Sequence, residues 1–188
     1  VSGAGLGGGR LGPRRNVFDN KASAAYVPPG TWVDIQADDG VEAAIVSATV
    51  SATSLDGQAA LVTPDQVRVQ LRGKPGFQRE VHDIVDSRIP ARRLLVGETF
   101  NRPGEWSSYP PHKHDELIPG VEYPLEEVYY FRIDPPQGFG VQVIYSPTKG
   151  VDESYRVLDG DVTILPFGYH PVAAAPGYRL YYLWALAG

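Results

Sequence analysis

WSSYPPHKHDELIPGVEYPLEEVYYFRI, residues Trp106–Ile133, and GDVTILPFGYH, residues Gly160–His170, are the deciding segments for the architecture of this chain. Aromatic and β-branched residues between prolines and glycines predict short strands in both segments. Three of the four histidines in the sequence, His112, His114 and His170, lie in these segments. This concentration of imidazoles predicts that the two segments meet at one metal ion.

Two predicted strands carry the residues that could bind the metal. Successive side chains of a β-strand point to opposite faces, so His112 and His114 share one face and Lys113 points to the other. After a loop, Glu126 and Glu127 open a predicted strand, and either can bring a carboxylate to the same point. Imidazole and carboxylate suit zinc, manganese, iron, cobalt or nickel. A His-x-His motif alone is more often a surface or packed pair than a metal site.

Composition restricts the class of protein. Of 188 residues, 43% are hydrophobic and 11% aromatic, enough for a packed core, and 21 glycines with 17 prolines favour many short strands. Cysteine is absent, which excludes disulfides and thiol chemistry. The net charge of -5, without a basic stripe, argues against nucleic acid. No apolar run predicts a membrane span and no signal-peptide pattern is present, so a cytoplasmic location fits.

Strand patterns also occur outside the two deciding segments. The motif Pro28-x-Gly30-x-Trp32 can be aligned with Pro166-x-Gly168-x-His170, which indicates a weak internal repeat with tryptophan in place of histidine. Further strands are predicted within Ala24–Ile35 as strand, turn and strand, and over Val41–Val50, Val67–Leu71, Arg79–Val85, Arg92–Phe100, Gly140–Ser146 and Leu180–Leu186.

The order of His-x-His, glutamate, glycine-bounded strand and histidine resembles the ligand pattern of cupins with a long insertion. A closer resemblance covers nearly the whole chain. WSSYPPHKHD, LEEVYYFRIDPPQGFG, DGDV, PFGYHPV, PGY and YYLWALAG, in this order, are similar to the C-terminal half of the 5-deoxy-glucuronate isomerase family of myo-inositol catabolism, which is related to 4-deoxy-5-ketouronate isomerase.

The resemblance implies an all-β fold built from cupin β-barrels of the jelly-roll type. It implies a bicupin, with a degenerate N-terminal half over residues 1–90 and a metal-binding C-terminal barrel over residues 91–188. The chain starts at Val1 and lacks methionine, and family members are longer at the N-terminus. We therefore expect a further N-terminal part in the natural protein.

The same resemblance implies that His112, His114, Glu127 and His170 bind a divalent metal, zinc or manganese. Glu127 is preferred over Glu126 because it directly precedes a valine and an aromatic run, as the ligand glutamate does in the pectin-degrading relative.

The implied reaction converts the aldose 5-deoxy-D-glucuronate to the ketose 5-dehydro-2-deoxy-D-gluconate. A metal on the aldehyde oxygen and the neighbouring hydroxyl would stabilise negative charge on either oxygen. An enediol formed by a protein base and a metal-promoted hydride shift both remain open. Tyr129 shares the inward face with Glu127, which places its hydroxyl near the metal. Tyr129 and Glu126 are the candidate bases, although strand alternation points Glu126 away.

A sugar acid also needs a cation for its carboxylate. Lys113 and Arg132 are near the ligands in sequence, but alternation turns both away from the ligand face. An arginine from elsewhere in the chain is the alternative. Gln142 and Tyr145, on the predicted strand Gly140–Ser146, are further candidates for substrate binding.

Other functions use the same ligand set. Cupin dioxygenases and decarboxylases act on organic acids, a non-catalytic cupin binds a sugar acid without turnover, and a related isomerase acts on 4-deoxy-5-ketouronate. The loop Asp115–Pro124 is either a lid over the metal or a passive connection. We expect a small-molecule partner, no nucleic acid, no membrane and a homo-oligomer, since exposed sheet edges favour association.

Overall fold

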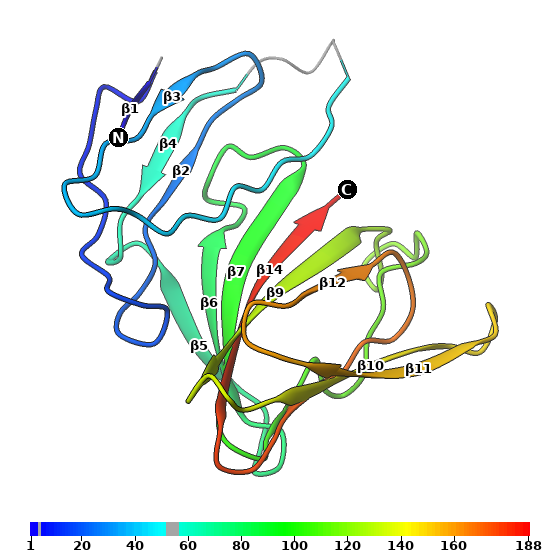
Figure 1. The fold of residues 1–188 in the computed structure, drawn as a ribbon. Coiled ribbons are helices and arrows are strands. Elements are labelled where there is room, and N and C mark those ends of the chain that lie inside the picture. Colours follow the sequence, from blue (N-terminus) through cyan, green and yellow to red (C-terminus); the bar gives the residue numbers. More distant parts are fainter. Residues whose placement is uncertain (4, 52–56) are drawn as a thin grey trace. The chain divides into compact units, whose positions relative to one another are not determined.

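The computed structural model describes residues 1–3, 5–51 and 57–188 and is built of β-strands (Figure 1). No helix occurs in the described ranges, so none there is long and apolar enough to cross a membrane. The predicted all-β class is confirmed. The strands are β1 (Ser2–Gly3), β2 (Ala24–Tyr26), β3 (Val33–Asp34), β4 (Ala60–Val62), β5 (Arg68–Arg72), β6 (Arg79–Val85), β7 (Leu94–Asn101), β8 (Trp106–Ser107), β9 (Glu126–Asp134), β10 (Gly140–Ser146), β11 (Val151–Val157), β12 (Val162–Leu165), β13 (Val172–Ala174) and β14 (Arg179–Ala187).

Two compact units divide the chain. Unit 1 comprises Val1–Arg68 and Asp83–Val96, and unit 2 comprises Val69–His82 and Gly97–Gly188. Each unit is therefore assembled from two separate stretches of sequence. The predicted division into barrels over residues 1–90 and 91–188 stays a prediction.

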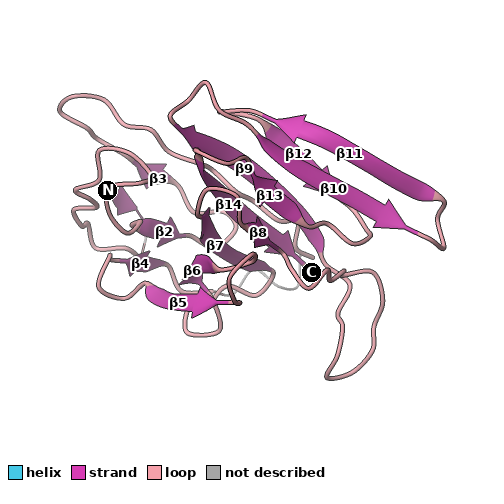
Figure 2. Cartoon of the chain, turned by 90° about the horizontal axis from the view of Figure 1, so that it is seen from below, coloured by secondary structure: helices cyan, strands magenta, loops and turns pink. Residues whose placement is uncertain are grey.

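Unit 2 contains the core that supports both deciding segments. A six-stranded sheet has the order β12-β9-β14-β7-β6-β5, and a four-stranded sheet has the order β11-β10-β13-β8 (Figure 2). β9 and β14 pair antiparallel over their full lengths, as do β10 and β11. One core cluster draws apolar side chains from both sheets, so the two sheets pack together. Its members are Tyr129, Phe131, Ile133, Val157, Leu165, Val172, Ala174, Leu180 and Tyr182.

Side-chain alternation along β9 sets the inward face of the larger sheet. Glu127, Tyr129, Phe131 and Ile133 are buried, whereas Glu126 is exposed at the start of the same strand. Apolar side chains on this face gain roughly 25 cal/mol per Å² of buried surface, which fixes the register of the strand. The aromatic run therefore holds Glu127 inward, although a carboxylate there is itself costly to bury.

Unit 1 has a smaller core and shorter strands. β2 pairs with β4, and β1 pairs with β3, each as a two-stranded antiparallel sheet. The predicted strand-turn-strand over Ala24–Ile35 thus forms two strands, but they pair with other partners. The apolar cluster of unit 1 comprises Ala22, Val62, Val67, Ile84 and Val85.

The predicted strand over Val41–Val50 is wrong. No strand is assigned there, and Val41 and Ile45 are 65% and 91% exposed. A β-strand is stabilised by its neighbours on the sheet, and this segment has the β-branched residues of a strand without a paired partner.

Gly97 in β7 gives a stability prediction for unit 2. A Cβ at this position would lie 2.2 Å from the Trp184 ring and 2.4 Å from the His82 carbonyl oxygen. Neither the backbone nor the large Trp184 ring can move aside without a cost in packing. We therefore expect Gly97→Ala to lower the free energy of unfolding by roughly 1–3 kcal/mol. Chemical denaturation measures this. The exposed neighbour Leu95→Ala should change it by less than about 0.5 kcal/mol, and equal effects of the two substitutions would contradict the packing.

Candidate metal centre

Three imidazoles converge in unit 2. His112 and His114 lie in the loop between β8 and β9, and His170 follows the turn after β12. One ligand atom from each histidine lies within 4.8 Å of the others. The ring centroid of His170 is 4.8 Å from that of His112 and 5.4 Å from that of His114. The structure thus brings together the three histidines that the sequence singles out.

The predicted strand for the His-x-His motif is wrong, because the motif lies in a loop. Pro110 and Pro111 precede it, and proline cannot donate a hydrogen bond to a sheet. The Glu122 carboxylate orders the loop instead. Its Oε1 accepts hydrogen bonds from Lys113 Nζ at 2.8 Å and from the Asp115 backbone N–H at 2.7 Å. Lys113 is therefore tied to Glu122 within the loop, and the predicted direction of its side chain relative to the imidazoles stays a prediction.

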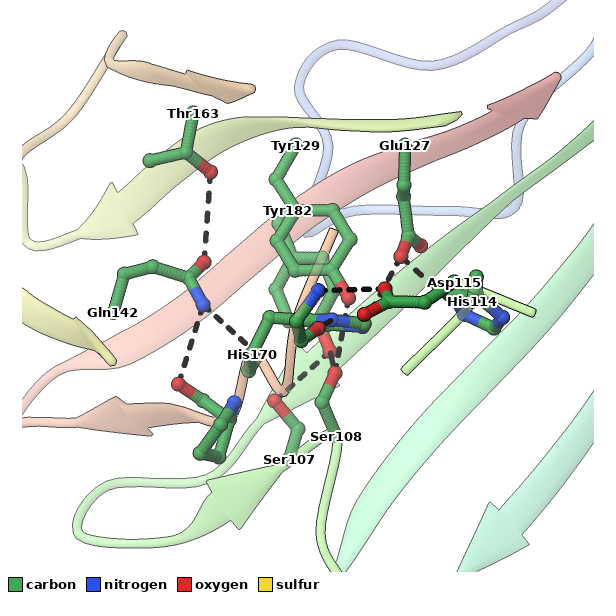
Figure 3. A network of polar contacts seen from close by, with 12 residues as sticks. Ser107, Ser108, His114, Asp115, Glu127, Tyr129, Gln142, Thr163, His170 and Tyr182 are labelled. Carbon is green, nitrogen blue, oxygen red and sulfur yellow. Dashed lines mark hydrogen bonds and ion pairs between the residues drawn. The ribbon is translucent and has the colours of Figure 1, made fainter. Parts of the chain in front are cut away.

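Glu127 supplies a carboxylate to the same group. Its Oε2 lies 3.2 Å from His170 Nε2 and 3.6 Å from His114 Nε2 (Figure 3). Glu127 is 5% exposed and His170 2% exposed. Glu127 Oε2 and His170 Nε2 are both buried and neither forms a hydrogen bond with a described residue. Such atoms are rare inside proteins, and a bound cation is one of their ordinary explanations.

Protonation fits metal binding. His112 is an exposed residue, yet partial desolvation of its ring, followed by the charges of His170 and His114, lowers its pKa to about 4. Burial also lowers the pKa of His114, against the opposing effect of Glu127. Burial also lowers the pKa of His170, but the contact with Glu127 outweighs this effect, so the pKa of His170 is raised overall. His112 and His114 are therefore neutral near pH 7, the form that binds metals.

A second layer of contacts holds His170. Its Nδ1 lies 2.8 Å from the Gly168 carbonyl oxygen, so Nδ1 carries the donated hydrogen and Nε2 faces the other ligands. The Gly168 N–H donates to Asp115 Oδ1 at 2.7 Å, and Gln142 Nε2 donates to the His170 carbonyl at 2.9 Å. Gly168 has φ +87°, and a Cβ there would lie 2.9 Å from the Tyr145 carbonyl, so glycine is required in this turn.

Asp115 connects the two ligand-bearing segments and gives a testable prediction. We expect Asp115→Ala to weaken zinc affinity by about 10–100-fold, because the turn carrying His170 loses its anchor. Asp115→Asn keeps an acceptor oxygen for the Gly168 N–H and should retain most of the affinity. Competition with a chromogenic chelator measures both. Equal losses in the two variants would show that charge, and not this hydrogen bond, supports the site.

Four hydroxyl groups are in contact in the buried interior near the Glu127 carboxylate. Tyr129 Oη lies 3.0 Å from Ser108 Oγ, and Tyr182 Oη donates to Ser107 Oγ at 2.9 Å (Figure 3). Burial, followed by the charges of Glu127 and Tyr182, raises the pKa of Tyr129 well above its ordinary value. The Tyr129 phenol is therefore protonated at neutral pH and able to donate a hydrogen bond.

The other residues predicted to act on substrate have partners within the protein. Lys113 and Arg132 form ion pairs with Glu122 at 2.8 Å and Asp159 at 2.9 Å. Gln142 is fully buried against backbone carbonyls, Tyr145 stacks on Tyr169 with ring centroids 4.9 Å apart, and Glu126 is exposed. Their proposed roles stay predictions.

Three residues around the site were not predicted from the sequence: Asp115, Ser108 as a partner of Tyr129, and Tyr182. Asp115 is adjacent to the His-x-His motif, so its position was visible, but its bond to Gly168 joins residues far apart in sequence. The same holds for the contact of Ser108 with Tyr129.

Comparison with known proteins identifies the family of the chain. The model of the KduI/IolB family matches residues 1–188. The chain belongs to the KduI/IolB family. Curated relatives named 5-deoxy-glucuronate isomerase include those of Geobacillus kaustophilus, 42% identical over 181 residues and 95% of this chain, and Bacillus subtilis strain 168, 38% identical over 180 residues and 95% of this chain. A crystal structure of an IolB-like protein from Salmonella typhimurium LT2 superposes with a TM-score of 0.78 at 34% identity, over 95% of this chain and 67% of that one.

The chain spans only part of these relatives. It covers 64% of the length of the Geobacillus kaustophilus protein and 65% of the Bacillus subtilis protein. About a third of each relative therefore lies outside the region that this chain matches.

Proposed function

We propose that His112, His114, Glu127 and His170 hold one divalent metal ion. The observation that carries this proposal is the pair of buried atoms without hydrogen bonds, Glu127 Oε2 and His170 Nε2, which face each other at 3.2 Å. Two further imidazoles, both neutral near pH 7, stand beside them. Three imidazoles and one carboxylate fit zinc or manganese and leave room for a substrate oxygen.

We further propose that the protein isomerises 5-deoxy-D-glucuronate to 5-dehydro-2-deoxy-D-gluconate, a step of myo-inositol catabolism. The names of the family relatives support this assignment. Moving the carbonyl from C1 to C2 transfers one hydrogen between these carbons and one proton between their oxygens. When bound, the metal supplies electrostatic stabilisation of negative charge on those oxygens.

The side chains around the site have roles in this proposal that follow from their positions. Tyr129 keeps its proton and can donate it as a hydrogen bond to a substrate oxygen, while Ser108 orients the phenol at 3.0 Å. Glu126 is exposed on the opposite face of β9, which does not support its use as a base. Whether an enediol or a hydride shift is used is a question for isotope labelling at C2.

We also propose the finer fold of the family resemblance, a cupin-type barrel in unit 2 within a bicupin. Two antiparallel sheets around one core support the barrel. The degenerate N-terminal barrel, the homo-oligomer and the cytoplasmic location stay predictions.

The experiment uses the natural full-length protein. Metal content is measured by elemental analysis, and ketose formation from 5-deoxy-D-glucuronate is followed by NMR under nitrogen. We expect about one metal ion per chain, loss of turnover after chelation, and recovery when zinc or manganese is restored.

Metal binding without ketose formation would leave the metal proposal intact and overturn the isomerase. Oxygen uptake or release of carbon dioxide with an organic acid would then identify a dioxygenase or decarboxylase. Turnover of 4-deoxy-5-ketouronate alone would change the substrate but keep the reaction class.

A further inference from the structure

Arg79 is a cation on the inward face of unit 2 that the metal site does not use. It opens β6 and is half-buried. His82 on the same strand points to the other face, where its ring meets Phe100 at 4.7 Å between centroids. Because side chains alternate along a strand, Arg79 lies on the face opposite to His82. That face also carries Thr99, which alternates with Phe100 on β7 and hydrogen-bonds Tyr182.

The head of Arg79 lies close to the segment that leads into the metal ligands. Its Nη1 donates to the Phe77 carbonyl at 3.3 Å, and the Phe77 ring meets Tyr109 at 5.3 Å between centroids. Tyr109 precedes His112 by three residues. Electrostatics agree with this position. Burial lowers the pKa of Arg79, the Tyr182 and Tyr129 phenols oppose it, and the charge of Arg79 contributes to the lowered pKa of His112.

Arg79 has no acidic partner within the described part of the chain. The lysine and arginine ion pairs described in unit 2 join Lys113 to Glu122, Arg132 to Asp159 and Arg179 to Asp134, and none of them includes Arg79. A guanidinium has five N–H donors, and the one hydrogen bond described for Arg79 goes to a carbonyl. A half-buried charge without a counter-ion is costly, which indicates an anionic ligand.

We propose that Arg79 binds the carboxylate of the substrate and thereby selects sugar acids over neutral sugars. This rests on the proposed isomerase function and fills the one role that Lys113 and Arg132 cannot serve while paired. An arginine binds a carboxylate through two parallel N–H donors, which fixes the far end of the sugar while its carbonyl end faces the imidazoles.

The test compares Arg79→Gln and Arg79→Lys with Arg72→Gln, all in the full-length metal-loaded protein. Arg72 belongs to the same hairpin but is exposed and bonded to Gln70, so it controls for loss of a positive charge. Calorimetry measures binding of D-glucuronate and of D-glucose, which differ in the carboxylate. Steady-state kinetics with 5-deoxy-D-glucuronate give KM and kcat separately, and thermal unfolding verifies that each variant is folded.

We expect Arg79→Gln to raise KM about tenfold or more, with a smaller fall in kcat, and to abolish the preference for D-glucuronate over D-glucose. Arg79→Lys should keep part of the preference, because it keeps the charge but not the two-donor geometry. Arg72→Gln should behave as the parent. If Arg79→Gln does not fold, the Lys variant decides by the same measurements.

Two results would overturn the proposal: parent protein that binds both sugars equally, or an Arg79 variant that keeps the parent's preference. Its failure is separable from failure of the isomerase. A parent that binds D-glucuronate through Arg79 but forms no ketose would contradict the proposed function alone.

Discussion

We expect His170→Ala to weaken metal binding about 100-fold or more and to remove the proposed isomerase activity. The binding free energy of a four-ligand zinc site is roughly 10–16 kcal/mol, so the loss of one ligand costs about 3 kcal/mol, or about two orders of magnitude. Among the proposed ligands, His170 is the one held by the most hydrogen bonds, since Gly168, Asp115 and Gln142 all fix its segment. Competition with a chelator measures the affinity, and NMR measures the turnover.

The matched control for His170→Ala is His82→Gln. His82 is the remaining histidine, also buried in unit 2, but it contacts Glu80 at 2.7 Å and Glu98 at 3.6 Å on the opposite face of the sheet. We expect this variant to keep the parent's metal affinity. Loss of metal from His82→Gln together with retention in His170→Ala would contradict the proposed site and place the metal at His82, Glu80 and Glu98 instead.

Glu127→Gln has the second large effect. The substitution keeps the size of the side chain but removes the only carboxylate among the proposed ligands. We expect metal affinity to fall about 100-fold, with a comparable loss of kcat/KM. The neighbouring Glu126→Gln is exposed on the other face and should retain both. The reverse outcome would exchange the roles of the two glutamates.

Glu127 also has a pH signature in metal-free protein. Contact with Glu127 raises the pKa of His170 above its unfolded value, so its stabilising effect is complete below about pH 6.5 and is lost as the pH rises through the folded-state pKa. Glu127→Gln removes this effect. In urea denaturation of metal-free protein, the variant should therefore lose more stability relative to the parent at about pH 6 than at about pH 8. An equal difference at both pH values would contradict the contact.

Local patterns in the sequence predicted which side chains come together better than they predicted the backbone that carries these side chains. Alternation along β9 correctly separated Glu127 from Glu126, because the aromatic run has one face to bury. The same rule failed for the His-x-His motif, where two prolines prevent a strand and the Glu122 carboxylate shapes a loop. The strand expected at Val41–Val50 failed because pairing depends on partners that a local pattern does not specify.

Residues that support the site through long-range contacts were not predictable. Asp115 bonds Gly168 across 53 positions, and Arg79 reaches the inward face from a hairpin that contains no metal ligand. Strand alternation would place Arg79 on one of two faces, but only the burial of His82 beside Glu98 and Phe100 shows which.

Anomalous diffraction from a cobalt- or zinc-loaded crystal, recorded at the metal absorption edge, locates the metal ion directly. We expect one strong anomalous peak in unit 2, within bonding distance of His112, His114, Glu127 and His170, and its disappearance in His170→Ala. A loaded, active protein whose peak lies away from these four side chains would contradict it.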